Sequence, residues 1–145
     1  MNVPTRSFRI ALLALFLAIP AAQASDLARK GEILFQRRCV RCHTLDEKGD
    51  RKLGPFLGRV YGARAGSADS YPHSEAYRKA GDLGLIWTED TLVPYMRNPK
   101  GFLADFAKDE SAESRMVFKL ANENERKAIA AFLHSLSEDE SAEAP

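Results

Sequence analysis

Cys39-Val40-Arg41-Cys42-His43 contains both cysteines of the 145-residue chain and follows them at once with a histidine. Two thiols three positions apart can add to the two vinyl groups of one porphyrin, and the next imidazole can then bind the iron. The stretch therefore predicts covalent attachment of one haem c through Cys39 and Cys42, with His43 as an axial ligand.

Three other uses of such a cysteine pair are weighed against this prediction. A thioredoxin-type redox pair belongs in a βαβ context and does not explain His43. A zinc site of the usual four-ligand kind needs a second Cys/His pair, whereas His73 and His134 stand far apart and alone. A disulfide between the two cysteines would close a loop too short to constrain the unfolded chain much. Haem attachment remains the best interpretation.

The start of the chain has the features of an export signal. Arg6 and Arg9 precede an uncharged apolar run over residues 10–19, and Ala22-Gln23-Ala24 offers the small residues of a cleavage site. The run is shorter than the roughly 20 residues of a membrane span. We therefore expect residues 1–24 to be a cleaved secretory signal peptide and the mature protein to lie in the periplasm; an uncleaved anchor is the alternative.

The remaining sequence has the length of one domain, which we place at residues 25–136. Residues 137–145 carry four acids and no base, which is typical of a disordered, solvated tail. The formal net charge of the whole chain is only +1, so nothing in the charge indicates a nucleic-acid partner.

Three helices are predicted from apolar spacing and capping residues, Phe102, Leu103 and Phe106 could pack down as a further short helix, and no stretch alternates as a strand. The first covers residues 26–38, the second runs from Thr88 to before Asn98-Pro99, and the last runs from Asn122, a plausible N-cap, to Leu136. Gly31 is costly inside a helix, so we expect it to mark a close approach to the last helix. Pro94 should kink or shorten the second helix. The fold class is therefore all-α.

The sixth coordination position of a haem bound to His43 needs a ligand or remains open to a substrate. Met96, Met116, His73 and His134 are the candidates. Met96 and His134 fall within predicted helices, whereas Met116 lies in a predicted loop from which its thioether could turn toward the iron. The residues alone leave this choice open.

Short motifs on both sides of the haem attachment stretch occur in a characteristic order. From about residue 26 to 136 the chain resembles a class I cytochrome c, most of all the bacterial cytochrome c2 type. The resemblance rests on Lys30-Gly31, Phe35, residues 39–43, Gly54-Pro55, Gly58, Arg64, Trp87-Thr88, Asn98-Pro99-Lys100, Met116-Val117-Phe118, Ile129 and Phe132. It implies the cytochrome c fold, with the N- and C-terminal helices crossing where Gly31 and Phe35 meet Ile129 and Phe132.

The resemblance also implies roles for individual residues around the haem. Met116 becomes the distal ligand opposite His43, and the Pro55 carbonyl accepts the other imidazole N–H. The implied neighbours of the propionates are Arg64, Tyr71 and Trp87, and Phe118 covers the haem face beside the methionine. His73 and Tyr77 replace polar positions that border the buried propionate.

A haem with histidine and methionine ligands has no open position, so we expect a one-electron carrier, not an enzyme. The resemblance implies a cytochrome bc1 complex as donor and a terminal oxidase or photosynthetic reaction centre as acceptor, with transient docking of a monomer. The expected docking residues are Arg38, Arg41, Arg51, Lys100 and Arg115. The alternatives are an open-site haem enzyme or gas-binding protein, and a carrier subunit dedicated to one periplasmic oxidoreductase.

Overall fold

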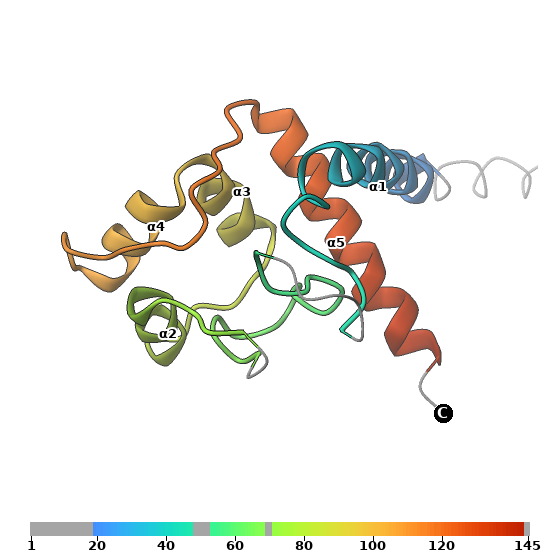
Figure 1. The fold of residues 1–145 in the computed structure, drawn as a ribbon. Coiled ribbons are helices and arrows are strands. Elements are labelled where there is room, and N and C mark those ends of the chain that lie inside the picture. Colours follow the sequence, from blue (N-terminus) through green and yellow to red (C-terminus); the bar gives the residue numbers. More distant parts are fainter. Residues whose placement is uncertain (1–18, 48–52, 69–70, 144–145) are drawn as a thin grey trace, which may run out of the picture.

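The described part of the chain contains five helices joined by long loops (Figure 1). The computed structural model describes residues 19–47, 53–68 and 71–143. The helices are α1 (Ile19–Arg38), α2 (Glu75–Asp82), α3 (Glu89–Arg97), α4 (Pro99–Ala107) and α5 (Glu123–Glu143). Across these described ranges there is no strand, only an isolated bridge between Arg64 and Ile86. The all-α prediction is confirmed.

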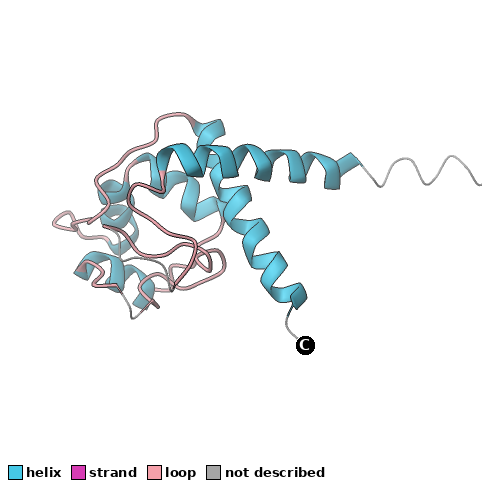
Figure 2. Cartoon of the chain, turned by 45° about the vertical axis from the view of Figure 1, so that its right-hand side comes forward, coloured by secondary structure: helices cyan, strands magenta, loops and turns pink. Residues whose placement is uncertain are grey.

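The first and last helices cross and pack on each other, as Figure 2 shows. At the crossing a Cβ on Gly31 would lie 2.6 Å from the carbonyl carbon of Ala128 and 2.8 Å from the Cβ of Phe132. Only glycine allows the two backbones to come this close. Phe35 is completely buried beside this point, and its ring centroid lies 5.6 Å from that of Phe132. The expected close approach at Gly31 is therefore present.

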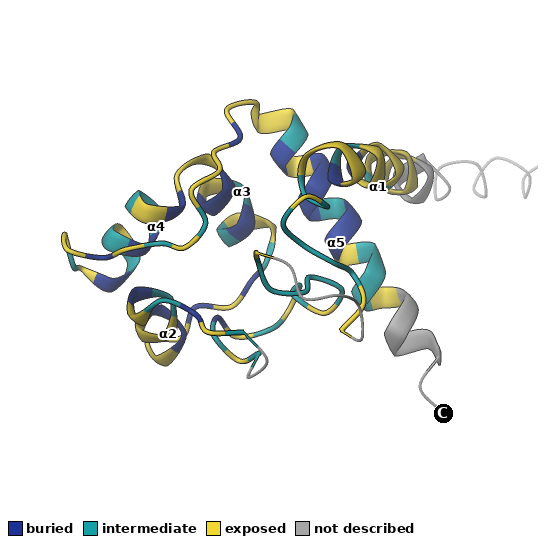
Figure 3. Cartoon of the chain, in the orientation of Figure 1, coloured by how far each residue is buried: buried dark blue, intermediate teal, exposed yellow. Residues whose placement is uncertain are grey.

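The three shorter helices form the other side of the core. α3 packs on α5 and on α4, and α2 packs on α4. Aromatic rings fill the space between them, with Trp87 and Tyr95 at the centre and 4.8 Å between their ring centroids. In Figure 3 the buried part of α5 is the part that crosses α1 and continues toward α3. The core thus runs from the α1–α5 crossing to the aromatic cluster.

The helix limits differ from the predicted ones at both ends of the chain. α1 begins at Ile19 and not near Asp26, because the full chain supplies helix-forming residues upstream of the expected cleavage point. α5 begins after Asn122, whose side chain accepts hydrogen bonds from the N–H groups of Asn124 and Glu125 as an N-cap does. It continues to Glu143, so residues 137–143 are helical where disorder was expected. Residues 1–18 of the signal lie outside the described ranges.

In the middle of the chain, α3 begins after Thr88 as predicted and continues through Pro94 to Arg97. α2 was not predicted. α4 starts directly at Pro99, because a proline at the first helical position loses no intrahelical hydrogen bond. No helix among the described residues combines the length and the apolar character that a bilayer crossing requires.

Candidate haem site

The end of α1 places the attachment stretch on a single turn. The N–H of Cys39 still donates to the carbonyl of Phe35 (2.8 Å), and the N–H of His43 donates to the carbonyl of Cys39 (2.9 Å). Both cysteines are half-buried thiols that form no disulfide. Burial, and secondly Cys42, raise the pKa of Cys39 to about 11, so this thiol is neutral at ordinary pH. The turn thus presents two thiols and one imidazole together.

The imidazole of His43 is held by the loop that follows. Its Nδ1–H donates to the carbonyl oxygen of Pro55 over 2.7 Å. The loop itself is fixed by a 2.7 Å hydrogen bond from the N–H of Gly54 to the carbonyl of Cys42. A Cβ on Gly54 would lie 2.7 Å from Nδ1 of His43, so the ring fits closely over this glycine. The contact that the resemblance implied for Pro55 is present in the structure.

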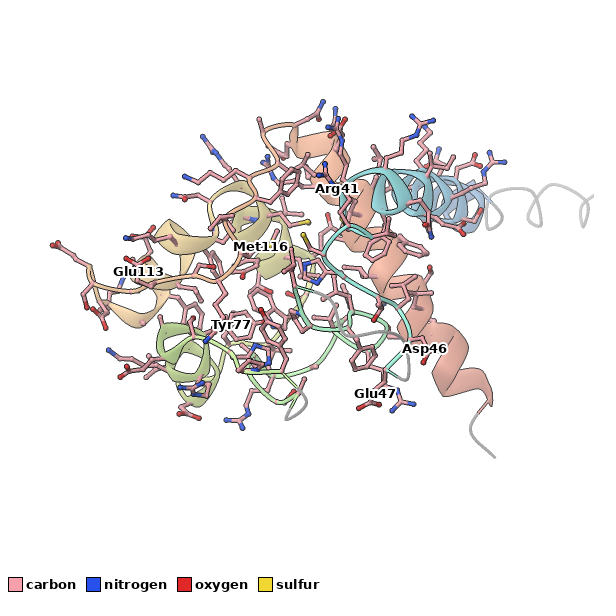
Figure 4. All side chains as sticks on the ribbon, viewed as in Figure 1. Arg41, Asp46, Glu47, Tyr77, Glu113 and Met116 are labelled. Carbon is pink, nitrogen blue, oxygen red and sulfur yellow. The ribbon has the colours of Figure 1, made fainter. Side chains whose placement is uncertain are left out.

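Met116 lies in the loop between α4 and α5, packed against the core. The Ser114 hydroxyl accepts from the backbone N–H of Met116 (3.2 Å) and donates to its carbonyl (3.1 Å), which fixes the backbone at this residue. Burial raises the pKa of Tyr95 to about 12, while a hydrogen bond with Ser114 acts in the opposite direction. In the view of Figure 4, Met116 lies between the turn that carries Arg41 and the side chain of Tyr77.

The residues after Met116 are more exposed. Phe118 is 42% exposed, and its place over the haem face stays a prediction. Ser114 and Tyr95, in contrast, are site residues that the sequence interpretation missed. Tyr95 lies on the apolar face of a predicted helix, so its sequence position indicated only a packing role. Ser114 stands two residues before the loop residue Met116, and a serine at such a position is a recognisable turn signal.

A cavity of about 580 Å³ opens beside this loop system. That volume is in the range of small-molecule and cofactor sites. Its walls include Pro55, Val60, Arg64, His73, Tyr77 and Trp87. Residues 39–43 do not line the cavity. Its walls come from the loops that follow the attachment stretch and from the residues around α2 and before α3.

Two buried nitrogen atoms in the cavity-lining residues have no hydrogen-bond partner among the described residues: Trp87 Nε1 and His73 Nε2. Trp87 is 2% exposed and His73 is 8% exposed. Buried polar atoms of this kind are normally satisfied, so they indicate a polar group that enters the cavity. A haem fits this description, because its apolar ring carries carboxylates at one edge, and a carboxylate can accept from the indole N–H.

The other two predicted propionate neighbours reach the site less directly. Arg64 lines the cavity, but its guanidinium forms an exposed ion pair of 3.0 Å with Asp82. The hydroxyl of Tyr71 donates to the carbonyl of Leu53 (2.8 Å), which ties together two loops at the site. Tyr71 also contacts the edge of the His73 ring, so it supports a residue that lines the cavity.

Four of the five predicted docking residues lie in the described ranges, and these four are exposed but differ in their surroundings. Arg38 lies 3.7 Å from Glu125, and Lys100 forms an ion pair with Glu113. Arg41 is exposed within the attachment turn, and Arg115 is exposed directly before Met116 in the sequence. The fifth expected residue, Arg51, lies outside the described ranges.

Comparisons with known proteins agree with this geometry. The family model described as "Cytochrome c" matches residues 28–137. A cytochrome c2 of Rhodopseudomonas palustris is 38% identical over 133 residues, which cover 88% of this chain and 92% of that protein. A cytochrome c2 of Rhodospirillum rubrum is 39% identical over 100 residues, which cover 69% of this chain and 89% of that protein.

Solved structures give the same answer for the fold. The ferricytochrome c2 of Rhodopseudomonas palustris superimposes with a TM-score of 0.68 at 37% identity, covering 75% of this chain and 97% of that one. The cytochrome c2 of Rhodospirillum centenum gives 0.69 at 33% identity with the same coverage. The chain therefore belongs to the cytochrome c family, whose cofactor is one covalently attached haem c.

Proposed function

We propose that this cytochrome c is an exported one-electron carrier in which Cys39 and Cys42 hold the haem and His43 and Met116 are the axial ligands. The haem iron, when bound by an imidazole and a thioether, supplies exchange between Fe(II) and Fe(III) with no position open to a substrate. What the chain must do is fix these ligands, exclude water and let a redox partner approach.

The hydrogen bond between His43 and Pro55 is the observation that carries the proposal. A carbonyl oxygen can only accept, so Nδ1 must carry the hydrogen. In the neutral ring the lone pair then belongs to Nε2, the nitrogen that a metal would bind. Such a bond also fixes the orientation of the ring and makes it a better ligand. His43 is therefore held in the tautomer that axial ligation needs.

The surroundings of Met116 support its role as the second ligand. The two hydrogen bonds of Ser114 fix the backbone of residue 116, and the residue packs against the core. The other methionine considered, Met96, is 7% exposed and lies within α3 as part of the hydrophobic core. Met116 is thus on a loop that can approach the haem, whereas Met96 serves packing.

Matched substitutions of the two methionines test the ligand assignment. We expect the holoprotein with Met116→Leu to lose the weak long-wavelength ferric absorption of a sulfur–iron bond, to have a lower reduction potential, and to bind carbon monoxide when reduced. Met96→Leu should leave all three close to those of the unsubstituted protein. Ready binding of carbon monoxide by the unsubstituted ferrous protein would instead favour an open-site haem protein.

For the partners, we propose a cytochrome bc1 complex as electron donor and a terminal oxidase or photosynthetic reaction centre as acceptor, reached in the periplasm by a monomer. Arg41 and Arg115 are exposed on the two segments that carry the proposed ligands. Positive charges on these two segments favour the approach of a redox partner with an acidic surface through long-range attraction. Arg38 and Lys100 contribute less to this attraction, since each has an acidic neighbour.

A further inference from the structure

The loop that carries Met116 comprises residues 108–122 between α4 and α5 (the Met116 loop) and is fixed by backbone hydrogen bonds near its two ends. Near the first end, the N–H of Asp109 donates to a carbonyl of α4 over 3.0 Å. Near the second end, the N–H of Leu120 donates to a carbonyl of α3 over 2.9 Å. Over residues 113–119, no backbone hydrogen bond joins the loop to another described residue. Met116 thus lies in the part of the loop that backbone hydrogen bonds hold least.

Two lysines from other elements form ion pairs with the loop before Met116. Nζ of Lys79, in α2, lies 3.0 Å from Oδ2 of Asp109, and Lys100, in α4, forms an ion pair with Glu113. In Figure 4 Glu113 lies toward the outside of the molecule and Met116 toward its centre. Because α2 packs on α4, the two ion pairs join the first half of the Met116 loop to one packed pair of helices.

Both carboxylate oxygens of Asp109 are used. Oδ2 accepts from Lys79, and Oδ1 accepts from the N–H (3.0 Å) and the hydroxyl (2.6 Å) of Ser111. These contacts, with Ser111 first, lower the pKa of Asp109 to about 2, so its charge is present at ordinary pH. Ala112 is 3% exposed, and its N–H donates to the Asp109 carbonyl over 3.1 Å. The start of the loop is therefore an ordered turn on the core, and Lys79 connects this turn to α2.

The backbone at Lys108 shows that the entry to the loop depends on the contacts around it. Its φ of 51° lies in the left-handed region, which is uncommon for residues other than glycine. Such a conformation persists when the surrounding structure determines it. On one side of Lys108 lies the end of α4, and on the other lies Asp109 with its lysine and serine partners.

We propose that Lys79 and Lys100 are positioning residues, whose ion pairs with the Met116 loop keep the thioether of Met116 on the haem iron. This inference rests on the proposed function, because it needs Met116 as an axial ligand. Neither lysine lines the cavity, so both act through the loop. Loss of either ion pair should increase the fraction of molecules in which Met116 has left the iron while the helices stay folded.

An external ligand of the ferric iron can measure this fraction. Imidazole can take the position of Met116 only when the thioether has left the iron. Its apparent affinity is therefore proportional to the fraction of molecules in which the position is open. An exposed ion pair changes an equilibrium of this kind by about two- to fivefold. The proposal thus predicts a tighter apparent binding of imidazole when an ion pair is removed.

The test is titration of the ferric holoprotein with imidazole at about pH 8, where imidazole is mostly neutral. Binding is followed by loss of the weak long-wavelength absorption of the sulfur–iron bond. We expect Lys79→Gln to bind imidazole about two- to fivefold more tightly than the unsubstituted protein, and Lys100→Gln to change in the same direction. Lys79→Arg keeps a charge that suits a carboxylate, so it should restore the original affinity. Equal affinities of Lys79→Gln and the unsubstituted protein would overturn the proposal.

Lys127→Gln is the matched control, because it removes a similar ion pair at another place. Nζ of Lys127 lies 2.8 Å from Glu123, and the lysine side chain is 45% exposed, against 47% for Lys79. Lys127 and Glu123 both belong to α5 and lie outside the Met116 loop. We expect this variant to bind imidazole as the unsubstituted protein does. An equal rise in affinity in Lys127→Gln would indicate an effect of net charge alone and would overturn the proposal.

A second measurement needs no substitution in the ion pairs. Salt screens exposed charges, so the affinity of the unsubstituted protein for neutral imidazole should rise with ionic strength. An affinity that stays constant across a salt series would overturn the proposal. Failure of the proposed function is separately visible with Met116→Leu. If Met116 is not the ligand, this variant binds imidazole no more tightly than the unsubstituted protein does.

Discussion

Gly31→Ala tests how closely α1 and α5 approach, and the structure sets the size of the effect. The new Cβ would lie 2.6 Å from the carbonyl carbon of Ala128 and 2.8 Å from the Cβ of Phe132. Carbon atoms in favourable contact are about 3.5–4.0 Å apart. The helices must therefore separate by about 1 Å at the crossing, since a backbone carbonyl cannot turn aside as a flexible side chain can.

The change in the free energy of unfolding is the balance of three terms. Overpacking of a close-fitting core costs about 1–3 kcal/mol, and the backbone contact places this case at the upper end. Separation of the helices also weakens the buried contact of Phe35 with Phe132, by about 1 kcal/mol if a quarter of a Phe→Ala loss is assumed. Alanine recovers about 1 kcal/mol through its better helix propensity. We expect a net loss of about 3 kcal/mol.

The assay is thermal unfolding of the ferric holoprotein, followed by far-ultraviolet circular dichroism. A loss of this size lowers the midpoint by about 12 °C for a domain of roughly 100 residues. Lys30→Ala, at the exposed neighbouring position of α1, is the control and should change the stability by no more than about 0.5 kcal/mol. If Gly31→Ala proves as stable as the unsubstituted protein, or more stable, the close crossing is refuted.

Three further predictions concern the site, acid stability and docking. In Gly54→Ala the Cβ would lie 2.7 Å from Nδ1 of His43, so the ring must move, and we expect shifted His43 resonances in NMR spectra together with an altered reduction potential. The side chain of Ser111, followed by Lys79, lowers the pKa of Asp109 from 3.8 to about 2. Its stabilising contribution is therefore present above pH 3.8 and is lost as the pH falls toward 2, and Asp109→Asn should remove that part of the acid dependence seen in unfolding titrations. Electron exchange with an acidic redox partner should slow as ionic strength rises, because salt screens the attraction between exposed charges. A constant rate across a salt series would contradict a steering role for Arg41 and Arg115.

The parts of the fold that could be predicted are those with strong local signals. Asn122 caps α5 and Thr88 precedes α3, because capping depends on a few adjacent residues. α2 was not predicted although Ser74 caps it and its buried residues Ala76, Ala80 and Gly81 lie on one face, because such small residues do not stand out among the apolar side chains of the sequence. At Gly81 a Cβ would lie 2.9 Å from the carbonyl carbon of Ala65, a contact made across the fold. Such tertiary contacts override local propensity.

The helix limits missed at α4 and α5 have local explanations as well. Asn98-Pro99 was interpreted only as the end of a helix, yet Asn98 both ends α3 and precedes α4, since Pro99 suits the first helical position. The tail after Leu136 was interpreted from its charge alone. Its serines, alanines and glutamates are compatible with a helix that is already nucleated by the packed part of α5, because extension costs less than nucleation.

The residues of the site that are close in sequence could be predicted, whereas those brought together by the fold could not. The cysteines and His43 lie on one turn, so the motif alone predicted their grouping. The cavity, in contrast, is assembled from the loop after residue 53, from His73 before α2 and from Trp87 before α3. No spacing rule brings these residues together. The buried, unpaired nitrogens of His73 and Trp87 could therefore be recognised only from the structure.

The two sides of the core use different side chains, and this difference follows what each side must cover. Between α1 and α5 the buried contacts are apolar, as at Phe35 and Ile129. Around the cavity they are Tyr77, Trp87 and Tyr95, rings that bury a large apolar area and keep one polar atom. A wall that only had to be packed could use phenylalanine and leucine without the cost of an unpaired N–H. Its polar atoms therefore fit a ligand with an apolar body and carboxylates at its edge, while the α1–α5 crossing holds the turn from which the proposed iron ligand His43 projects.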